Sequence, residues 1–126
     1  MTQEEKDLLL KDLCARLPYD VKVNCNDKVY NFAGIQYFNI CILTDDNENN
    51  AFTTAGIKYI KPYLFPMSSM SDEQLPYYIT TLKYSEETRG MVETPNSFDW
   101  LNKNHYDYRG LIPKGLALDA TGLNIY

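Results

Sequence analysis

The sequence predicts an α+β fold in which an N-terminal helix packs on a small antiparallel β-sheet, followed by a helical and irregular C-terminal third. Two observations lead to this prediction. Leucine recurs at helical spacing in residues 2–17, whereas residues 21–61 carry the short alternating and β-branched runs that are typical of strands. The links between these runs are too short for parallel crossovers, so the strands are expected to be antiparallel. A small SH3-like barrel over residues 20–61 is the alternative architecture.

The first helix is expected over residues 2–17. It starts with a capping box, in which the Thr2 hydroxyl accepts from the amide of Glu5 and the Glu5 carboxylate accepts from the amide of Thr2. Pro18 should end the helix, because proline disfavours the α conformation of the residue before it. The apolar stripe of this helix consists of Leu9, Leu10, Leu13, Cys14 and Leu17. We expect the stripe to pack on the apolar face of the sheet.

The strands are expected within residues 21–61. Residues 21–25 alternate between apolar and polar, and residues 29–33 and 36–43 are rich in β-branched and aromatic side chains. Gly34 lies between the last two runs and predicts a bulge or a tight bend. Residues 45–50 read as a polar loop, and residues 57–61 as a final strand that stops at Pro62.

Residues 62–126 are predicted to form short helices and irregular segments. An extended crossing segment is expected over residues 62–70. Ser71 opens a second capping box and a helix to about residue 82, unless Pro76 delays the helix until Leu75. Ser97 is expected to cap a short third helix. The later glycines and prolines divide the remaining residues into short pieces.

Composition indicates a single domain, residues 1–126, with no membrane or nucleic-acid partner. Twelve Lys and Arg oppose seventeen Asp and Glu, and the resulting net charge of −5 repels a polyanion. No stretch approaches the roughly 18 consecutive apolar residues of a membrane span. The three cysteines are odd in number and lack Cys-x-x-Cys spacing, which predicts free thiols and a cytoplasmic location.

His105 is the one histidine and therefore the candidate for acid–base catalysis. Asp107 is only two residues away and would not share a helical face with it, and no nucleophile elbow is present. The competing interpretation is that a protonated His105 ring caps the end of the third helix. Scattered cysteines and a single histidine do not make a standard zinc site, and glycine-rich phosphate motifs are absent, so no metal or cofactor is expected.

Aromatic residues and one arginine form the predicted binding surface. Tyrosine and arginine are favoured interface anchors, and the chain contains eleven tyrosines. The residues predicted to bind are Tyr59, Tyr63, Phe65, Tyr106, Tyr108 and Arg109. We therefore expect a non-catalytic protein-binding or accessory protein with an unidentified protein partner, which could also form a homo-oligomer. A small enzyme that uses His105 is the alternative.

Three stretches resemble a family of small proteins encoded by Bacteroidales bacteria, their phages and other mobile elements. These stretches are residues 1–19 (MTQEEKDLLLKDLCARLPY), 60–70 (IKPYLFPMSSM) and 104–126 (NHYDYRGLIPKGLALDATGLNIY). The resemblance implies a bacterial or phage cytoplasmic setting and favours an accessory or host-interaction role. It implies no particular activity, ligand or site residue.

Overall fold

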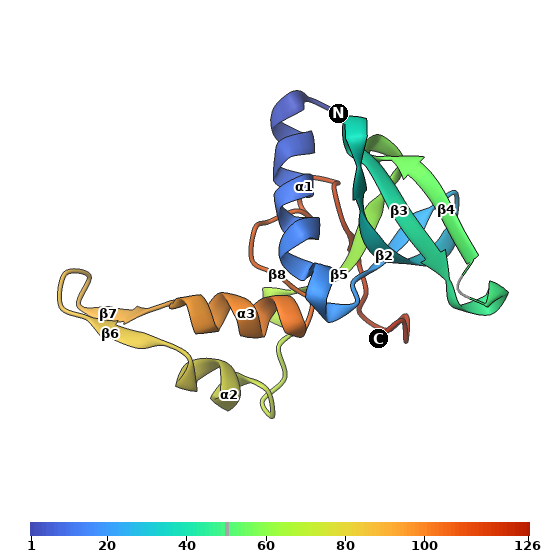
Figure 1. The fold of residues 1–126 in the computed structure, drawn as a ribbon. Coiled ribbons are helices and arrows are strands. Elements are labelled where there is room, and N and C mark those ends of the chain that lie inside the picture. Colours follow the sequence, from blue (N-terminus) through green and yellow to red (C-terminus); the bar gives the residue numbers. More distant parts are fainter. Residues whose placement is uncertain (50) are drawn as a thin grey trace.

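A seven-stranded sheet organises the computed structural model, which describes residues 1–49 and 51–126 (Figure 1). Its strand order is β4-β3-β2-β1-β5-β8, and β9 also pairs with β5. The strands are β1 Lys22–Cys25, β2 Lys28–Gln36, β3 Ile40–Asp45, β4 Ala51–Gly56, β5 Lys61–Pro66, β8 Tyr106–Asp107 and β9 Leu118–Asp119. Neighbours from β4 to β5 are antiparallel, as predicted, whereas β8 and β9 add to β5 in parallel.

The sheet is open, so the alternative of an SH3-like barrel that closes on itself is wrong. Closure would need β5 to pair with β4 after the meander. Instead β5 pairs with β1 along its first residues, and its remaining residues pair with β9 and β8. Among the described strands β4 is therefore left at one edge with β3 as its neighbour.

Helix α1 spans Gln3–Arg16 and starts with the predicted capping box. The Thr2 hydroxyl accepts from the Glu5 amide at 3.1 Å, and the Thr2 amide donates to the Glu5 carboxylate at 2.9 Å. Leu9 and Leu13 are fully buried against the sheet, which confirms that α1 packs on it. Cys14 and Leu17, also assigned to the apolar stripe, are exposed.

The structure differs from two of the predicted strands in the middle of the chain. Gly34 lies at a register shift between β2 and β3, which confirms the bulge, but β2 continues through it, and the turn η2 (Tyr37–Asn39) precedes β3. The predicted strand over residues 57–61 is wrong, because Ile57–Tyr59 form the 3₁₀ turn η4. Ile57 and Ile60 are both buried, and their spacing of three suits such a turn better than a strand.

The core lies between α1, the inner face of the sheet and the segment that follows β8. Alternate residues of β1 and β3 supply part of it, as their burial patterns show. The clustered side chains are Leu9, Leu13, Val21, Val23, Cys25, Phe32, Cys41, Leu43, Ile57, Ile60, Leu64, Leu111, Leu116 and Ala117. The three cysteines are free, as predicted.

Residues 71–100 form an arm that extends away from the sheet (Figure 1). The arm contains α2 (Leu75–Thr80), the hairpin of β6 (Lys83–Ser85) and β7 (Gly90–Val92), and most of α3 (Pro95–Lys103). The hairpin is a separate two-stranded sheet. Thr94, rather than Ser97, caps α3, and Ser97 is its partner in a capping box. Helix α2 begins at Leu75, the later start that Pro76 had suggested.

Candidate functional site

Two fully buried charges on α1 hold the segment after α3 against the helix. Arg16 donates to both carboxylate oxygens of Asp12, from Nε at 2.8 Å and from Nη2 at 3.1 Å. Arg16 Nη2 also donates to the backbone oxygen of Tyr106 at 2.6 Å, and Arg109 Nε donates to Asp12 at 3.1 Å. Asp12 is thus shared by two guanidinium groups, so the cluster fastens residues 106–109 to α1.

Tyr108 and Arg109, two of the predicted binding residues, use their polar groups within this cluster. The Tyr108 hydroxyl donates to Asn102 at 3.0 Å and accepts from Arg109 Nη2 at 2.9 Å. The guanidinium carbon of Arg109 lies 4.8 Å from the centroid of the Tyr108 ring, and that of Arg16 lies 5.5 Å from it. Such contacts stabilise the fold and leave little of these groups free for a partner.

Five stacked or tilted ring contacts run from the arm to the rest of the protein, which we call the body. We call this row of rings the aromatic ladder. Its members are Tyr78, Trp100, Tyr106, Phe65, Tyr126 and His105, with successive centroids 5.8, 5.7, 6.1, 5.8 and 3.7 Å apart. Two predicted binding residues, Phe65 and Tyr106, therefore pack inside the ladder. The Tyr106 hydroxyl also donates to the side chain of Gln74. The ladder joins the arm to the body.

The six predicted binding residues do not share one exposed surface. Tyr63 and Tyr106 are only 6% and 3% exposed, and the Tyr63 hydroxyl accepts from Asn24 at 2.9 Å. Of the six, only Tyr59, at 58%, is mostly exposed. Phe65 is half-buried, as are Tyr108 and Arg109. Their spacing in the sequence could not reveal this, because long-range packing decides which rings face inward.

The His105 ring packs against Tyr126 and its burial disfavours the protonated form, so the interpretation of a protonated helix cap is wrong. Its backbone is left-handed (φ 63°), and its ring stacks on Tyr126. Burial, and then the charge of Arg16, lower the pKa of His105 to about 4. Nδ1 is buried without a hydrogen-bond partner. The Asp107 carboxylate accepts instead from the amides of Leu111 and Ile112, both at 2.9 Å, so it does not orient His105.

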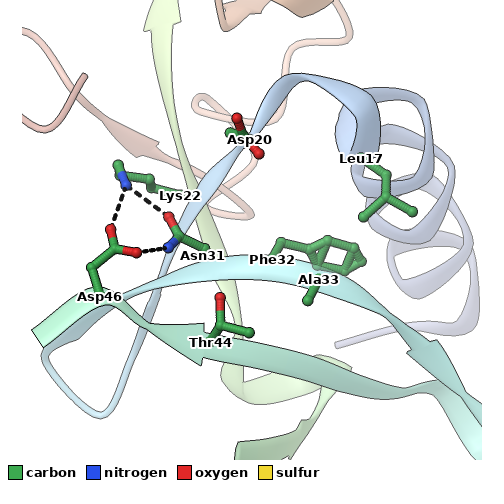
Figure 2. A pocket seen from close by; sticks show the side chains of 8 residues that line it. All are labelled: Leu17, Asp20, Lys22, Asn31, Phe32, Ala33, Thr44 and Asp46. Atoms are coloured by element: carbon green, nitrogen blue, oxygen red, sulfur yellow. Dashed lines mark hydrogen bonds and ion pairs between the residues drawn. The ribbon is translucent and has the colours of Figure 1, made fainter. Parts of the chain in front are cut away.

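A polar groove lies on the outer face of β1, β2 and β3 (Figure 2). Lys22 Nζ donates to Asn31 Oδ1 at 2.7 Å and lies 3.4 Å from Asp46, while Asn31 Nδ2 donates to Asp46 Oδ1 at 2.6 Å. The three side chains satisfy one another across the groove. Lys22, Asn31 and Asp46 are far apart in the sequence and form no motif from which this groove could have been predicted. Within the described residues, no cluster of three or more possible ligands could hold a metal ion.

The arm carries several large apolar side chains that water reaches. Leu75 and Ile79 stand one helical turn apart on the same side of α2, whereas Tyr77, two residues from each, points to another side of the helix. Tyr84 and Met91 are directly opposite each other across the hairpin, so they share one face of it. Their exposed fractions are 42% for Leu75, 67% for Tyr77, 48% for Ile79, 58% for Tyr84 and 54% for Met91.

The arm is folded, although none of its side chains belongs to the central core. Tyr78 donates to Glu93 at 2.5 Å, which joins α2 to the segment before α3. The hydroxyls of Thr94 and Ser97 both donate to the backbone oxygen of Thr81, at 2.8 and 2.9 Å. These hydrogen bonds fix the positions of the helix and the hairpin that carry the exposed apolar side chains.

Three comparisons with known proteins gave no match: no family model fits the chain, and no curated protein or solved structure is significantly similar to it. No helix of the described residues is long and apolar enough to cross a membrane.

Proposed function

We propose that this protein is a non-catalytic protein-binding module whose arm docks on a partner protein. The observation that carries the proposal is a folded element, separate from the core, that exposes apolar side chains on α2 and on the hairpin. Contiguous exposed apolar side chains mark interaction sites, and here Tyr84 and Met91 lie directly opposite each other across the hairpin. Tyrosine and methionine are both enriched in interfaces.

The hairpin itself supports this role. A two-stranded hairpin alone in water is only marginally stable, because neither face has a layer to pack against. In this arm, β6 pairs with β7 and with no other described strand, and the Tyr84–Met91 pair is exposed on one face. A partner surface laid on that face would bury both side chains and complete the missing layer.

Charge indicates the chemistry of the partner. The arm contains six carboxylates, Asp72, Glu73, Glu86, Glu87, Glu93 and Asp99. It contains two basic side chains, Lys83 and Arg89, so it carries −4 of the total charge of −5. We therefore propose a protein partner with an apolar patch rimmed by lysine and arginine, since complementary potentials select partners and speed association. Nucleic acid would be repelled.

The setting we propose is the cytoplasm of a bacterium, with a bacterial or phage origin. Three free thiols, two of them buried, support a reducing compartment. The resemblance of the two ends and the middle of the chain to proteins of Bacteroidales and their phages supports the origin. An accessory or host-interaction role follows from both.

The test compares wild type with the double variant Tyr84→Ser, Met91→Ser. Both side chains are exposed, so the variant should keep its melting temperature but lose the partner that tagged wild type captures from a bacterial lysate. The captured protein is then purified and titrated by calorimetry, with salt weakening its binding. Tyr37→Ser is the matched control, because Tyr37 is also exposed but lies outside the arm and is not one of the predicted binding residues. Equal binding by the double variant would refute the proposal.

A further inference from the structure

The edge of the sheet at β4 is long, regular and uncharged. All six of its residues pair with β3 in one continuous register, from Gly56 opposite Ile40 to Ala51 opposite Asp45. The strand reads Ala-Phe-Thr-Thr-Ala-Gly, without a charge or a proline, and its first four residues are exposed. Edge strands present unpaired amides and carbonyls, and proteins usually guard them with charges, prolines or bulges.

The opposite edge of the sheet offers little backbone for a further strand to pair with, and in this respect it differs from β4. Strands β8 and β9 are two residues long, and very short edge strands offer little to a new neighbour. The bulge at Gly34 lies inside the sheet, between β2 and β3, and does not protect β4. The face of β4 that carries Phe52 also remains exposed: Phe52 is 77% exposed and lies opposite Thr44.

We propose that β4 pairs antiparallel with β4 of a second copy of this chain, so that a two-fold axis joins the two sheets into one. The strand is complementary to itself about Thr53. In that register Thr53 faces its own copy, Ala51 faces Ala55, and Phe52 faces Thr54, so no like charges meet. Directly opposed threonines are a favourable cross-strand pair.

Charges at the two ends of β4 favour the same arrangement. The turn before the strand, η3 (Asp46–Glu48), carries two carboxylates that stay exposed although each lies 3.4 Å from a lysine of its own chain, and the turn after it, η4, carries exposed Lys58. Antiparallel pairing brings the start of one strand beside the end of the other. The acidic turn of each copy therefore comes next to Lys58 of its neighbour, whereas parallel pairing would bring like charges together.

Self-association through β4 leaves the arm free. Two arms that each carry a charge of −4 repel one another, so the arm is a poor surface for joining copies, whereas β4 is neutral. The β4 proposal is thus independent of the proposed function, and each can fail alone.

Sedimentation velocity over a range of protein concentrations tests the proposal. Wild type should reach the mass of two chains, and Thr53→Lys should sediment as one chain, because two lysines would face each other at the two-fold axis. Thr53→Val, which keeps the strand uncharged, should retain the dimer. Thr88→Lys adds the same charge at an exposed site in the arm and should also remain a dimer. Far-ultraviolet circular dichroism and melting curves establish that each variant is folded.

Disulfide trapping tests the register directly. Residues opposite each other across two antiparallel strands have Cα atoms about 4.5–5.5 Å apart, within the range that a disulfide spans. Thr53→Cys, in a background where exposed Cys14 is replaced by serine, should therefore form a covalent dimer under mild oxidation. A wild type that stays monomeric at every concentration, or a Thr53→Lys variant that still dimerises, would overturn the proposal. Monomeric wild type would point instead to a strand from another protein.

Discussion

Asp12 receives hydrogen bonds from Arg16 and Arg109 in a part of α1 that water does not reach. Replacing it with asparagine keeps the shape but leaves the buried Arg16 without a counter-charge. Breaking a buried ion pair on one side is expensive, so Asp12→Asn should lower the free energy of unfolding by about 3–5 kcal/mol. Urea unfolding measures the change. Asp7→Asn, on the exposed face of the same helix, should change stability little; equal effects of the two substitutions would contradict the cluster's role.

His105 should make the protein less stable as the pH falls from about 6.5 to about 4. The unfolded chain takes up a proton near the ordinary pKa of 6.5, whereas burial and Arg16 hold the folded pKa near 4. Above pH 6.5 the ring is neutral in both states and adds no pH dependence; within the window the unfolded state binds more protons, so folding weakens.

The variant His105→Asn isolates this effect, because asparagine tolerates a left-handed backbone and does not titrate in this range. The decline in unfolding free energy between pH 7 and pH 4 should be about 1–2 kcal/mol smaller in the variant, since partial exposure screens part of the shift. The charges of Asp20 and Lys22 act on the ring in opposite directions, since Asp20 raises and Lys22 lowers the pKa of His105, and both charges are present in wild type and variant alike. If the unfolding free energy falls equally with pH in wild type and variant, the His105 ring is not buried.

Among the elements, α1 shows both what its sequence pattern predicts and what it misses. The capping box predicted where the helix begins, because a cap depends on residues three apart. The leucine pattern found Leu9 and Leu13, but Asp12 and Arg16 on the same buried face are polar. Nothing local marks them as buried, since their partners Tyr106 and Arg109 lie some ninety residues away in the sequence.

Leu13 belongs to the part of the predicted apolar stripe that is buried, and Leu17 to the part that is exposed. Leu13 is fully buried, whereas Leu17 is 39% exposed in the turn η1 (Leu17–Tyr19) that follows α1. Leu13→Ala should lower the free energy of unfolding by about 2–5 kcal/mol through lost contacts and a residual cavity. Leu17→Ala should cost less than about 1 kcal/mol. Denaturant unfolding of both variants gives the comparison, and similar losses would mean that the helix presents a different face to the sheet.

The sequence pattern likewise predicted some of the strands and missed others. β1 was predicted because its alternation is regular, with one side of the strand buried. β4 was missed because both of its faces reach water, so its small and polar residues carry no alternation. β5 was assigned to a crossing segment because of Pro62 and Pro66, yet both prolines pair within the sheet. The candidate sites were missed for the same reason: exposure on the arm and at β4 depends on what the rest of the chain leaves uncovered.

At the scale of the whole molecule, the body and the arm should differ in local stability. The core cluster joins α1, the sheet and residues 111–117, whereas β6 and β7 of the arm pair only with each other among the described strands. The ladder contacts of the arm come from Tyr78 in α2 and Trp100 in α3, the helices on either side of the hairpin. Regions with few buried apolar contacts open at lower free energy than the core. Native-state hydrogen exchange should therefore show that the amides of β6 and β7 open more easily than those of β1–β3.

Trp100 is the ladder residue that links the two parts, because it stacks on Tyr106 and contacts Tyr78. Trp100→Leu keeps an apolar side chain but removes both ring contacts, so exchange in β6 and β7 should accelerate while that of β1–β3 changes much less. Tyr77→Leu is the control, since Tyr77 is 67% exposed and should leave both regions unchanged. Uniform acceleration across the chain would mean that arm and body unfold as one unit. A selective effect would show that the surface proposed to bind a partner can loosen without loss of the core, and binding should then restore its protection.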